Sequence, residues 1–513
     1  MASSIKNEHP LFLLIISFIV TFLIFIFYRL AMFDKGFDLG VDVYYHIKVA
    51  DMFPFISTTK HFPWTEMSIW KTNFYDKELG FHAILYVLRN ISNYLGFSSG
   101  APFNFIDFSL VFIVLLSTSI GGYIYNKSTS LMIPPLLVFA SPLFLQKLFM
   151  IRPFLISMSL FMIVVFILLW KTQLLYKCII IFFFGWIYSL CYSVPHIIII
   201  PVVCYIFAEI LMLKNRRACY SFFLLLSAIL GLCIGLVIHP QFPNTFIGWY
   251  VQGVIVIKQM FGLSVNKVVL GTGVHAPDLI TIVRNFLPLF FFVLYAVYFY
   301  LNKKKSIRDY FLFILLFVLT LGFFYTKRFN EYSVPLSVFC LAYAVRNYKY
   351  VMPGSKIFSF IDRKKITLIL VFLFISIPYY KNFSLPTLYR VSPPYEYAKW
   401  ASKNLKPGTY VGLLYWYDFP LLFYAADQFT YPVALDPMYG YYVYPQRMNV
   451  IDKFRLGEEL ISPKKLADAF GTNLLFVSYY NPGTIKYLLN KGAKVLYDDS
   501  QGALLNLVPN TLK

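Results

Sequence analysis

Apolar runs of about 20 residues without charged side chains recur along most of this chain. A helix of that length crosses the hydrocarbon core of a bilayer, and a soluble core helix is usually shorter. The 513 residues are 59% hydrophobic and have a mean hydropathy of +0.66. The pattern predicts a polytopic α-helical membrane protein with about eleven spans. The expected spans lie near residues 11–31, 105–125, 129–147, 152–170, 177–193, 196–213, 220–239, 284–302, 309–325, 332–346 and 366–380.

Basic residues account for a formal net charge of +21, and their position indicates a membrane orientation. They cluster in alternate short connections, at residues 171–177, 214–217, 303–308 and 346–365. Cytoplasmic loops carry such an excess of Lys and Arg, so a nucleic-acid partner is not required. We therefore expect an integral protein of the inner or plasma membrane. Its first span is a retained signal-anchor, its N-terminus is cytoplasmic and its C-terminal tail is extracytoplasmic.

The polar composition changes along the chain and suggests two domains. Residues 1–384 would form the transmembrane domain, with a first outer loop at 32–104 that contains amphipathic helices and a second long outer loop at 240–283. Short apolar strands alternate with helices in residues 385–513, which predicts a small, soluble, mostly parallel α/β domain. This domain contains no glycine-rich phosphate loop, so nucleotide binding is not supported.

The first outer loop opens with acidic and basic residues that follow directly on an apolar span. Asp38, Asp42 and His46 are spaced four residues apart, which would place them on one face of a helix, with Tyr45 and Lys48 beside them. A carboxylate at the edge of apolar material tends toward a raised pKa, which suits a general base. The alternative is a polar loop next to the membrane with no catalytic role.

A second polar cluster in the same loop contains Asp76, Glu78 and His82. Together with Asp42 it could hold a divalent metal of the hard-cation kind, Mg or Mn. Glu and His also occur four residues apart by chance on surface helices, so this spacing leaves the metal open.

Cationic residues lie at the expected outer ends of two spans. Arg152 begins one span, and Arg328 precedes Glu331 by one turn at the start of another. They could clamp a lipid phosphate, because a paired Arg stays oriented. Alternatively, they extend to lipid headgroups without a further role. His239, at the outer end of another span, is a supporting candidate or a structural histidine.

Three motifs of this chain resemble the GT-C superfamily of membrane glycosyltransferases, and most closely the catalytic subunit of archaeal and bacterial oligosaccharyltransferases. Residues 42–48 (DVYYHIK) are similar to the acidic motif of that family's first outer loop. Residues 327–332 (KRFNEY) resemble the Arg-Phe start of a late span, and residues 415–418 (YWYD) resemble the Trp-Trp-Asp element that opens the outer domain.

The resemblance implies roles for individual residues. Asp42 would be the catalytic or metal-binding carboxylate, and Asp76 is the second candidate. Arg328 would contact the donor phosphate, with His46, Lys48 and Arg152 as further cationic candidates. Trp416 and Asp418 would take part in acceptor recognition. The connection at 146–152 has no acidic pair, which favours an acceptor other than asparagine.

These observations predict an inverting glycosyltransferase that takes a sugar or oligosaccharide from a polyprenyl-phosphate-linked donor on the extracytoplasmic side. The partners would be that donor, membrane lipid and a glycan, lipid or protein acceptor. A transporter or flippase for a polar or lipid-linked substrate is the alternative, and it would place charged residues across the bilayer midplane. A structural or receptor protein with an outer sensing domain is a third possibility.

Overall fold

The structure, a computed structural model, describes residues 10–32, 38–97, 101–213, 221–260, 275–351, 390–479 and 482–509. The chain divides into two compact units, each built from segments that are distant in the sequence. Unit 1 comprises residues 1–39, 90–235 and 272–389, and unit 2 comprises residues 40–89, 236–271 and 390–513. Composition alone suggests one boundary at residue 385, whereas unit 2 combines the C-terminal residues with most of the first outer loop.

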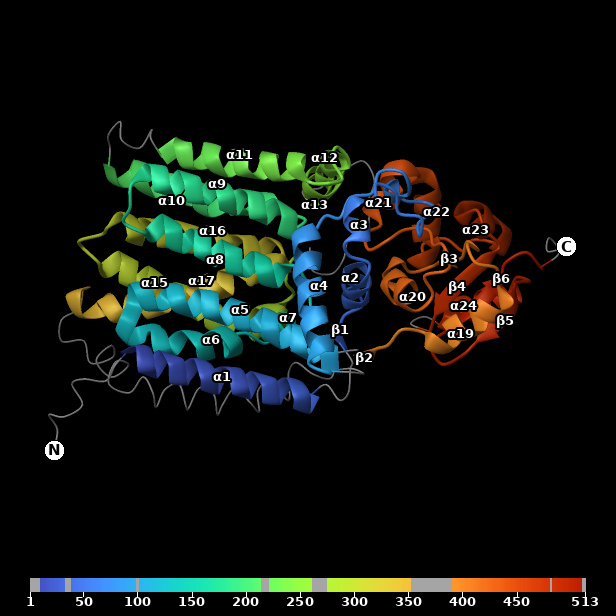
Figure 1. The fold of residues 1–513 in the computed structure, drawn as a ribbon, viewed down its shortest axis with the longest axis horizontal. Coiled ribbons are helices and arrows are strands. Elements are labelled where there is room, and N and C mark those ends of the chain that lie inside the picture. Colours follow the sequence, from blue (N-terminus) through green and yellow to red (C-terminus); the bar gives the residue numbers. More distant parts are fainter. Residues whose placement is uncertain are drawn as a thin grey trace. The chain divides into compact units, whose positions relative to one another are not determined.

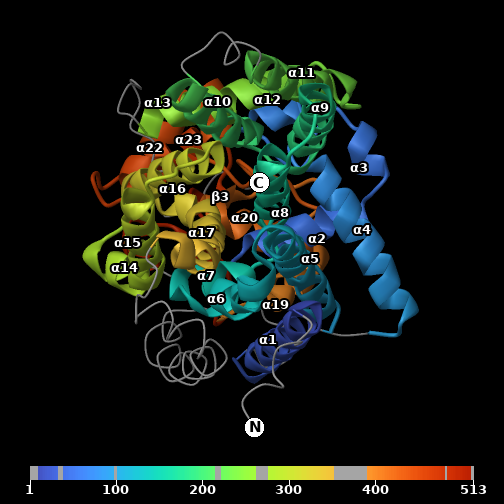
Figure 2. The ribbon, with the colours of Figure 1, turned by 90° about the vertical axis from the view of Figure 1, so that its left-hand side faces the viewer.

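Unit 1 is a bundle of helices that run side by side (Figure 1). They are α1 (Pro10–Met32), α5 (Ala101–Asn126), α6 (Ile133–Phe139), α7 (Pro142–Leu148), α8 (Phe154–Leu169), α9 (Leu174–Cys191), α10 (Ile199–Leu213), α11 (Phe222–Ile238, whose last turn belongs to unit 2), α14 (Leu279–Arg284), α15 (Phe286–Leu301), α16 (Ile307–Tyr325) and α17 (Asn330–Val351). Viewed end-on, α8 and α17 lie toward the middle of the bundle (Figure 2). Most of α8 is buried accordingly.

Five helical stretches of the described residues are long and apolar enough to cross a membrane. They are Pro10–Ala31, Phe103–Phe139, Leu174–Cys191, Pro195–Met212 and Ile307–Tyr325, and Phe154–Leu169, Phe222–Ile238 and Phe286–Leu301 are shorter apolar helices. Seven of these eight stretches each correspond to an expected span to within a few residues, whereas Phe103–Phe139 covers the expected span at 105–125 and part of that at 129–147. The expected span at 366–380 lies outside the described residues.

One expected span is interrupted in the structure. Residues 129–147 form a 3₁₀ segment (Lys127–Met132), then α6, then α7, rather than one helix. Ser141 adopts an extended conformation and its hydroxyl accepts a hydrogen bond from the Phe144 N–H, while Pro142 supplies no N–H at all. An N-cap followed by proline starts a new helix, so the apolar run could not continue through this point.

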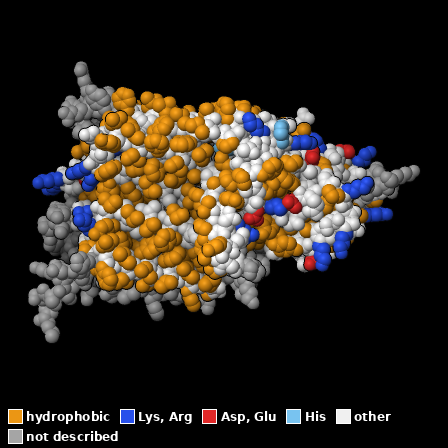
Figure 3. All heavy atoms as spheres, viewed as in Figure 1, with side chains coloured by type: hydrophobic (Ala, Val, Ile, Leu, Met, Phe, Trp, Pro, Cys, Tyr) orange, Lys and Arg blue, Asp and Glu red, His pale blue; other side chains and the backbone are white. Residues whose placement is uncertain are grey.

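The surface of unit 1 matches a membrane-embedded bundle. Figure 3 shows apolar side chains covering this unit, and large exposed hydrophobic residues occur on α1, α5, α9, α10, α11, α15 and α16. Exposed lysines occupy the connections between helices, at Lys127, Lys171, Lys303 and Lys304. The apolar surface is therefore too extensive for a monomer in water and fits a lipid environment.

Helices α9 and α11 approach each other at glycines. A Cβ atom on Gly231 would lie 2.1 Å from the Phe182 carbonyl oxygen, and one on Gly185 would lie 2.8 Å from the Ala228 carbonyl oxygen. Such contacts are too close for any side chain, so the two backbones touch along this line. Small residues allow this kind of close packing between helices in lipid.

Unit 2 contains Asp42, His46, Asp76, Glu78 and His82, which were singled out in the first outer loop. Its helices are α2 (Asp42–Asp51), α3 (Phe55–Thr58), α4 (Leu79–Tyr94, whose last residues belong to unit 1), α12 (Asn244–Trp249), a π-helical segment (Tyr250–Ile255), α13 (Val256–Met260), α19 (Tyr395–Asn404), α20 (Phe419–Ala425), α21 (Met438–Val443), α22 (Pro445–Arg455), α23 (Pro463–Phe470) and α24 (Pro482–Asn490). Helices α2 and α4 lie in the first outer loop, where two amphipathic helices were expected.

The sheet of unit 2 has the order β3-β4-β6-β5, formed by β3 (Gly412–Leu413), β4 (Leu474–Ser478), β5 (Lys494–Asp498) and β6 (Gly502–Asn506). Strands β3 and β4 are parallel, whereas β6 is antiparallel to both β4 and β5. The prediction of a mostly parallel sheet is therefore wrong, because the last two strands form a hairpin. Thr430 and Tyr431 make only isolated bridges, to Tyr410 and Thr65.

One aromatic core joins the first outer loop to the C-terminal residues within unit 2. The Trp70 and Tyr439 rings are 4.7 Å apart, and the Phe62 and Phe423 rings are 5.4 Å apart. The Tyr431 N–H donates to the Trp64 carbonyl at 2.9 Å. Because these side chains are large and buried, they anchor the segment at 61–75 in the core of unit 2.

Candidate functional site

Helix α2 begins at Asp42 because the chain reverses just before it. Gly40 has a φ of 99°, a left-handed conformation that favours glycine. Asp38 precedes this turn, in the two-residue strand β1 (Asp38–Leu39), so its predicted place on the same helix face as Asp42 and His46 is wrong. Asp42 and His46 remain one turn apart on α2, and His46 is buried.

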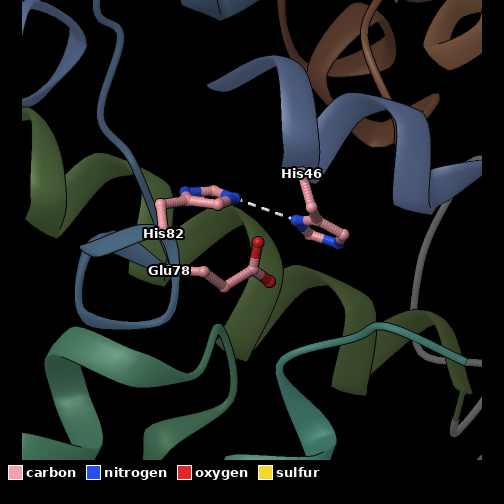
Figure 4. Close-up of side chains that lie close together, drawn as sticks. All are labelled: His46, Glu78 and His82. Atoms are coloured by element: carbon pink, nitrogen blue, oxygen red, sulfur yellow. Dashed lines mark hydrogen bonds between the residues drawn. The ribbon is translucent and has the colours of Figure 1, made fainter. Parts of the chain in front are cut away.

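A chain of buried hydrogen bonds links α2 to the start of α4. His46 Nδ1 lies 2.9 Å from His82 Nε2, and Figure 4 shows the two rings facing each other. On its other side, His82 Nδ1 lies 2.8 Å from Asp76 Oδ1 and 2.7 Å from Oδ2. A carboxylate can only accept here, so His82 carries a proton on Nδ1 whenever Asp76 is ionised. The lone pair of neutral His82 is then on Nε2, directed at His46.

Asp76 is held in place by partners from a distant segment. Its backbone N–H donates to the Gln241 side-chain oxygen, and its carbonyl accepts from His239 Nε2 at 3.0 Å. Burial opposes ionisation of Asp76, but the charge and hydrogen bonds of His82 outweigh it and hold the pKa below the usual value. Burial lowers the pKa of His239, and the neighbouring Asp76 only partly offsets this, which favours the neutral imidazole. His239 therefore positions the site as an uncharged donor.

Glu78 completes a group that could hold a metal ion. One ligand atom from each of His46, Glu78 and His82 lies within 4.8 Å of the others, and all three residues are buried. The Glu78 carboxylate extends toward the space between the two rings (Figure 4). Two imidazoles and one carboxylate form the donor set of catalytic zinc sites that keep a position open, and imidazole also suits other transition metals. Asp76 contacts His82 from behind, as an outer carboxylate does in such sites.

Asp42, Tyr45 and Lys48, the other candidates of the first outer loop, lie on the same helix as His46. Asp42, the first residue of α2, is half-buried. The buried Tyr45 ring lies 5.9 Å from the His82 ring, and burial together with the Asp76 and Glu78 charges raises the pKa of its phenol. Lys48 Nζ lies 2.6 Å from Asp427 Oδ2. Lys48 is therefore already paired with a carboxylate of the same unit.

Unit 1 contains a separate cationic group around Glu331. Lys147 Nζ lies 2.7 Å from Glu331 Oε1, and both side chains are nearly buried, 12% and 5% exposed. Arg328 and Arg152 lie near enough for their charges to act on Lys147. This group thus contains three cationic side chains and the Glu331 carboxylate. The phosphate-binding role of Arg328 and Arg152 stays a prediction.

In the C-terminal part of unit 2, only one of the two predicted recognition residues lines a cavity. Asp418 is 2% exposed and lines a cavity of about 270 Å³. Trp416 is half-buried and does not line this cavity. Burial raises the pKa of Asp418 to about 7, and the nearby Ser478 hydroxyl offsets part of this rise. The Asp418 Oδ2 and Ser478 Oγ atoms do not form a hydrogen bond with each other.

Solved structures of membrane glycosyltransferases share the arrangement of this chain. The archaeal oligosaccharyltransferase AglB from Archaeoglobus fulgidus, in complex with an inhibitory peptide and a dolichol-phosphate, matches with a TM-score of 0.59 and 12% identity, over 100% of this chain and 75% of that chain. ArnT from Cupriavidus metallidurans, bound to undecaprenyl phosphate, matches with a TM-score of 0.57 and 11% identity, over 96% and 98% of the two chains. The chain has the GT-C fold.

A third structure extends this comparison. The arabinofuranosyltransferase AftD from Mycobacteria matches with a TM-score of 0.56 and 13% identity, over 96% of this chain but 40% of that chain. No protein-family model and no curated protein matches the sequence. The GT-C fold is thus recognised from the path of the backbone at identities too low to carry over any substrate.

Sequence reasoning missed two contributors to these groups. Lys147 was passed over because its neighbours in the sequence are apolar, although a lone lysine in such a helix is a signal of a buried partner. Gln241 reaches Asp76 from 165 positions away, a distance that no local pattern reveals. Its place beside two prolines after an apolar span was the available signal.

Proposed function

We propose that this protein is an inverting glycosyltransferase that transfers a sugar or oligosaccharide from a polyprenyl-phosphate-linked donor to an acceptor hydroxyl on the extracytoplasmic side of the membrane. The GT-C fold supports the class of reaction. Two structures with that fold contain lipid phosphates, a dolichol-phosphate in AglB and undecaprenyl phosphate in ArnT. The observation that carries the proposal is the buried group of His46, Glu78 and His82 next to Asp42 in unit 2.

In this mechanism, Asp42 orients the acceptor hydroxyl and takes its proton. The acceptor oxygen forms a bond to the anomeric carbon while the bond from that carbon to the donor phosphate breaks. The polyprenyl phosphate leaves with the electron pair, and attack from the opposite face inverts the anomeric configuration. Asp42 suits this role because it is half-buried, so its carboxylate reaches substrate without being fully hydrated. Asp76 acts through His82 in this mechanism, because its carboxylate fixes the orientation and the tautomer of the His82 ring.

A divalent metal fits the donor set of this site. His46, Glu78 and His82 would hold it, and two imidazoles favour a transition metal such as Mn or Zn over Mg. One AglB structure is described as a complex with Zn and sulfate. When bound, such an ion would stabilise negative charge on the departing phosphate. The initial hard-cation assignment through Asp42 and Asp76 thus changes to a site in which Asp76 supports a ligand.

The cationic group of unit 1 is proposed separately to bind a lipid phosphate. Arg328 can form a planar, bidentate contact with phosphate oxygens, and Lys147 adds a point charge. Glu331 keeps Lys147 oriented until the phosphate arrives. Because Lys147 and Glu331 are nearly buried, water would screen the attraction between this group and a phosphate anion only weakly.

The orientation follows from the basic connections of unit 1. Lys171, Lys303 and Lys304 would face the cytoplasm by the positive-inside rule, with the C-terminal residues and the catalytic group on the other side. A donor that is already lipid-linked suits an active site on that side.

Transfer by point variants in membranes tests this proposal. Host membranes that carry their own lipid-linked sugars are labelled metabolically, and the label that moves from lipid to acceptor is measured. We expect Asp42→Asn and His82→Ala to lose transfer by at least about 100-fold, the scale of a lost catalytic group. Asp51→Asn is the matched control, because Asp51 is an exposed carboxylate at the other end of α2.

Normal transfer by either site variant would refute the assignment to this group. Movement of intact lipid-linked sugar across the bilayer by the wild type, without release of lipid phosphate, would favour the transporter or flippase alternative. Nuclear magnetic resonance of the product establishes whether the anomeric configuration inverts.

A further inference from the structure

The cavity next to Asp418 is built at one edge of the sheet of unit 2. Strands β3 and β4 are parallel, and the residues that follow their carboxyl ends both reach the cavity. Asp418 lies five positions after β3, and Ser478 is the last residue of β4. Ser500 and Gln501, in the turn between β5 and β6, also line it. Ligands of open α/β sheets bind outside the carboxyl ends of parallel strands, and this cavity occupies that position.

Two buried polar atoms in this cavity are not satisfied by the protein. Asp418 Oδ2 and Ser478 Oγ have no hydrogen-bond partner within the part of the chain that the structure describes. Their residues are only 2% and 4% exposed. Asp418 stands at the N-cap of α20, where an aspartate usually accepts a bond from its own helix, yet its side chain makes no such bond. An unpaired buried acceptor is costly, so its retention here indicates a ligand that donates to it.

The lining of the cavity restricts the class of ligand. No Lys, Arg or His is among the described lining residues, which argues against a phosphate, a sulfate or any other anion. Phe476, Leu421 and Leu422 supply an apolar wall, and Tyr479 adds an aromatic ring. A single water needs only about 10–15 Å³ of such space, so about 270 Å³ accommodates a ring with its substituents. Hydroxyl donors on a partly apolar ring are the chemistry of a sugar.

We propose that this cavity binds one neutral sugar ring of a glycan, whose hydroxyl groups donate to Asp418 and Ser478 while an apolar face of the ring packs on Phe476 and Tyr479. The inference rests on the proposed function only where it identifies this glycan as the acceptor. It then makes the acceptor a carbohydrate rather than a peptide. Binding itself requires neither the histidine group nor the donor phosphate.

Direct binding of methyl glycosides to the purified full-length protein tests the proposal. The methyl pyranosides of glucose, galactose, mannose and N-acetylglucosamine are titrated one by one and followed by saturation-transfer nuclear magnetic resonance. We expect at least one to bind, and Asp418→Asn to weaken it about tenfold or more, the effect of losing a hydrogen bond to a charged acceptor. Ser478→Ala should weaken it less. Asp468→Asn, which removes an exposed carboxylate of α23 in the same unit, should leave binding unchanged.

A second variant covers the case in which Asp418→Asn does not fold. Ser500→Trp places a large ring at the exposed rim of the cavity and should block binding while leaving Asp418 intact. The proposal is overturned if no glycoside binds, if a glycoside binds equally to Asp418→Asn and Ser500→Trp, or if a serine-containing peptide binds and the glycosides do not.

The proposed function is tested separately by His82→Ala. Loss of transfer with unchanged glycoside binding would support both proposals. Transfer that depends on His82 together with no glycoside binding would refute only the sugar cavity. Glycoside binding that depends on Asp418, with transfer unaffected by His82→Ala, would refute only the catalytic assignment.

Discussion

Asp76→Asn gives the most informative test of the buried histidine group, because it changes an atom that contacts a proposed metal ligand without being one. In the wild type, both carboxylate oxygens lie within 2.8 Å of His82 Nδ1, and Oδ1 also accepts from the Glu78 N–H at 3.1 Å. An asparagine keeps the volume but loses the charge, so it no longer fixes the His82 tautomer or raises the basicity of Nε2. Loss of such an outer carboxylate weakens metal binding about 10- to 100-fold.

The size of this effect can be read from metal-dependent stability. With Mn²⁺ or Zn²⁺ at 100 times the wild-type dissociation constant, binding adds about 2.7 kcal/mol to the free energy of unfolding. A variant that binds 100-fold more weakly would gain only about 0.4 kcal/mol at the same metal concentration. Without metal, Asp76→Asn should also cost about 1.5–3 kcal/mol, the contribution of a buried hydrogen bond with a charged partner.

The assay is thermal unfolding of the purified full-length protein in detergent, with each metal titrated into wild type, Asp76→Asn, His46→Ala and Asp51→Asn. Asp51→Asn should respond to metal like the wild type, because this carboxylate is exposed and pairs with Arg89. The reasoning fails if the metal stabilises Asp76→Asn as much as the wild type. It also fails if the wild type gains nothing from either metal, because the histidines would then form a hydrogen-bonded pair without an ion.

Three further variants probe other features. Burial raises the pKa of Asp418 to about 7 from a usual value of 3.8, so its protonated form stabilises the fold below about pH 4. This contribution to the free energy of unfolding, at most about 4 kcal/mol, is lost as the pH rises to about 7. When unfolding is followed over this pH range, Asp418→Asn should lack this part of the pH dependence. Glu331→Gln removes the partner of the buried Lys147 and should destabilise unit 1 by about 3–5 kcal/mol in denaturant unfolding. The double variant Glu331→Gln with Lys147→Met should recover most of this loss. A double variant as unstable as the single one would contradict the pairing. Gly231→Leu should abolish folding or separate α9 from α11, because even a Cβ lies 2.1 Å from a carbonyl, and a wild-type melting temperature would disprove that contact.

The sequence predicted the elements more reliably than their partners. Long apolar runs predicted most of the spans, because a bilayer demands a helix of a set length whatever surrounds it. The break at Ser141 was missed, since hydropathy averages over a capping residue and a proline. The antiparallel contact of β6 with β4 was not expected, because strand order depends on packing that no local pattern records.

The candidate site shows the same limit. Glu78 and His82 were paired from their spacing on one helix, and His46 was singled out one turn after Asp42. The contact between His46 and His82 joins positions 36 apart, and the Lys147–Glu331 pair joins positions 184 apart. Such pairs are set by how helices pack, so the sequence could identify the residue types without showing which of them meet.

Gly40 shows how much of this chemistry depends on a residue that takes no part in it. Only glycine adopts a φ of 99° at little cost, because it has no side chain. Gly40 immediately precedes the turn after which α2 begins at Asp42. A methyl group at this position would remove no polar atom. It would nevertheless force α2 to start elsewhere and turn the Asp42 carboxylate away. A search that ranks positions by reactive side chains alone would overlook Gly40, although its missing Cβ atom allows the turn that directs Asp42.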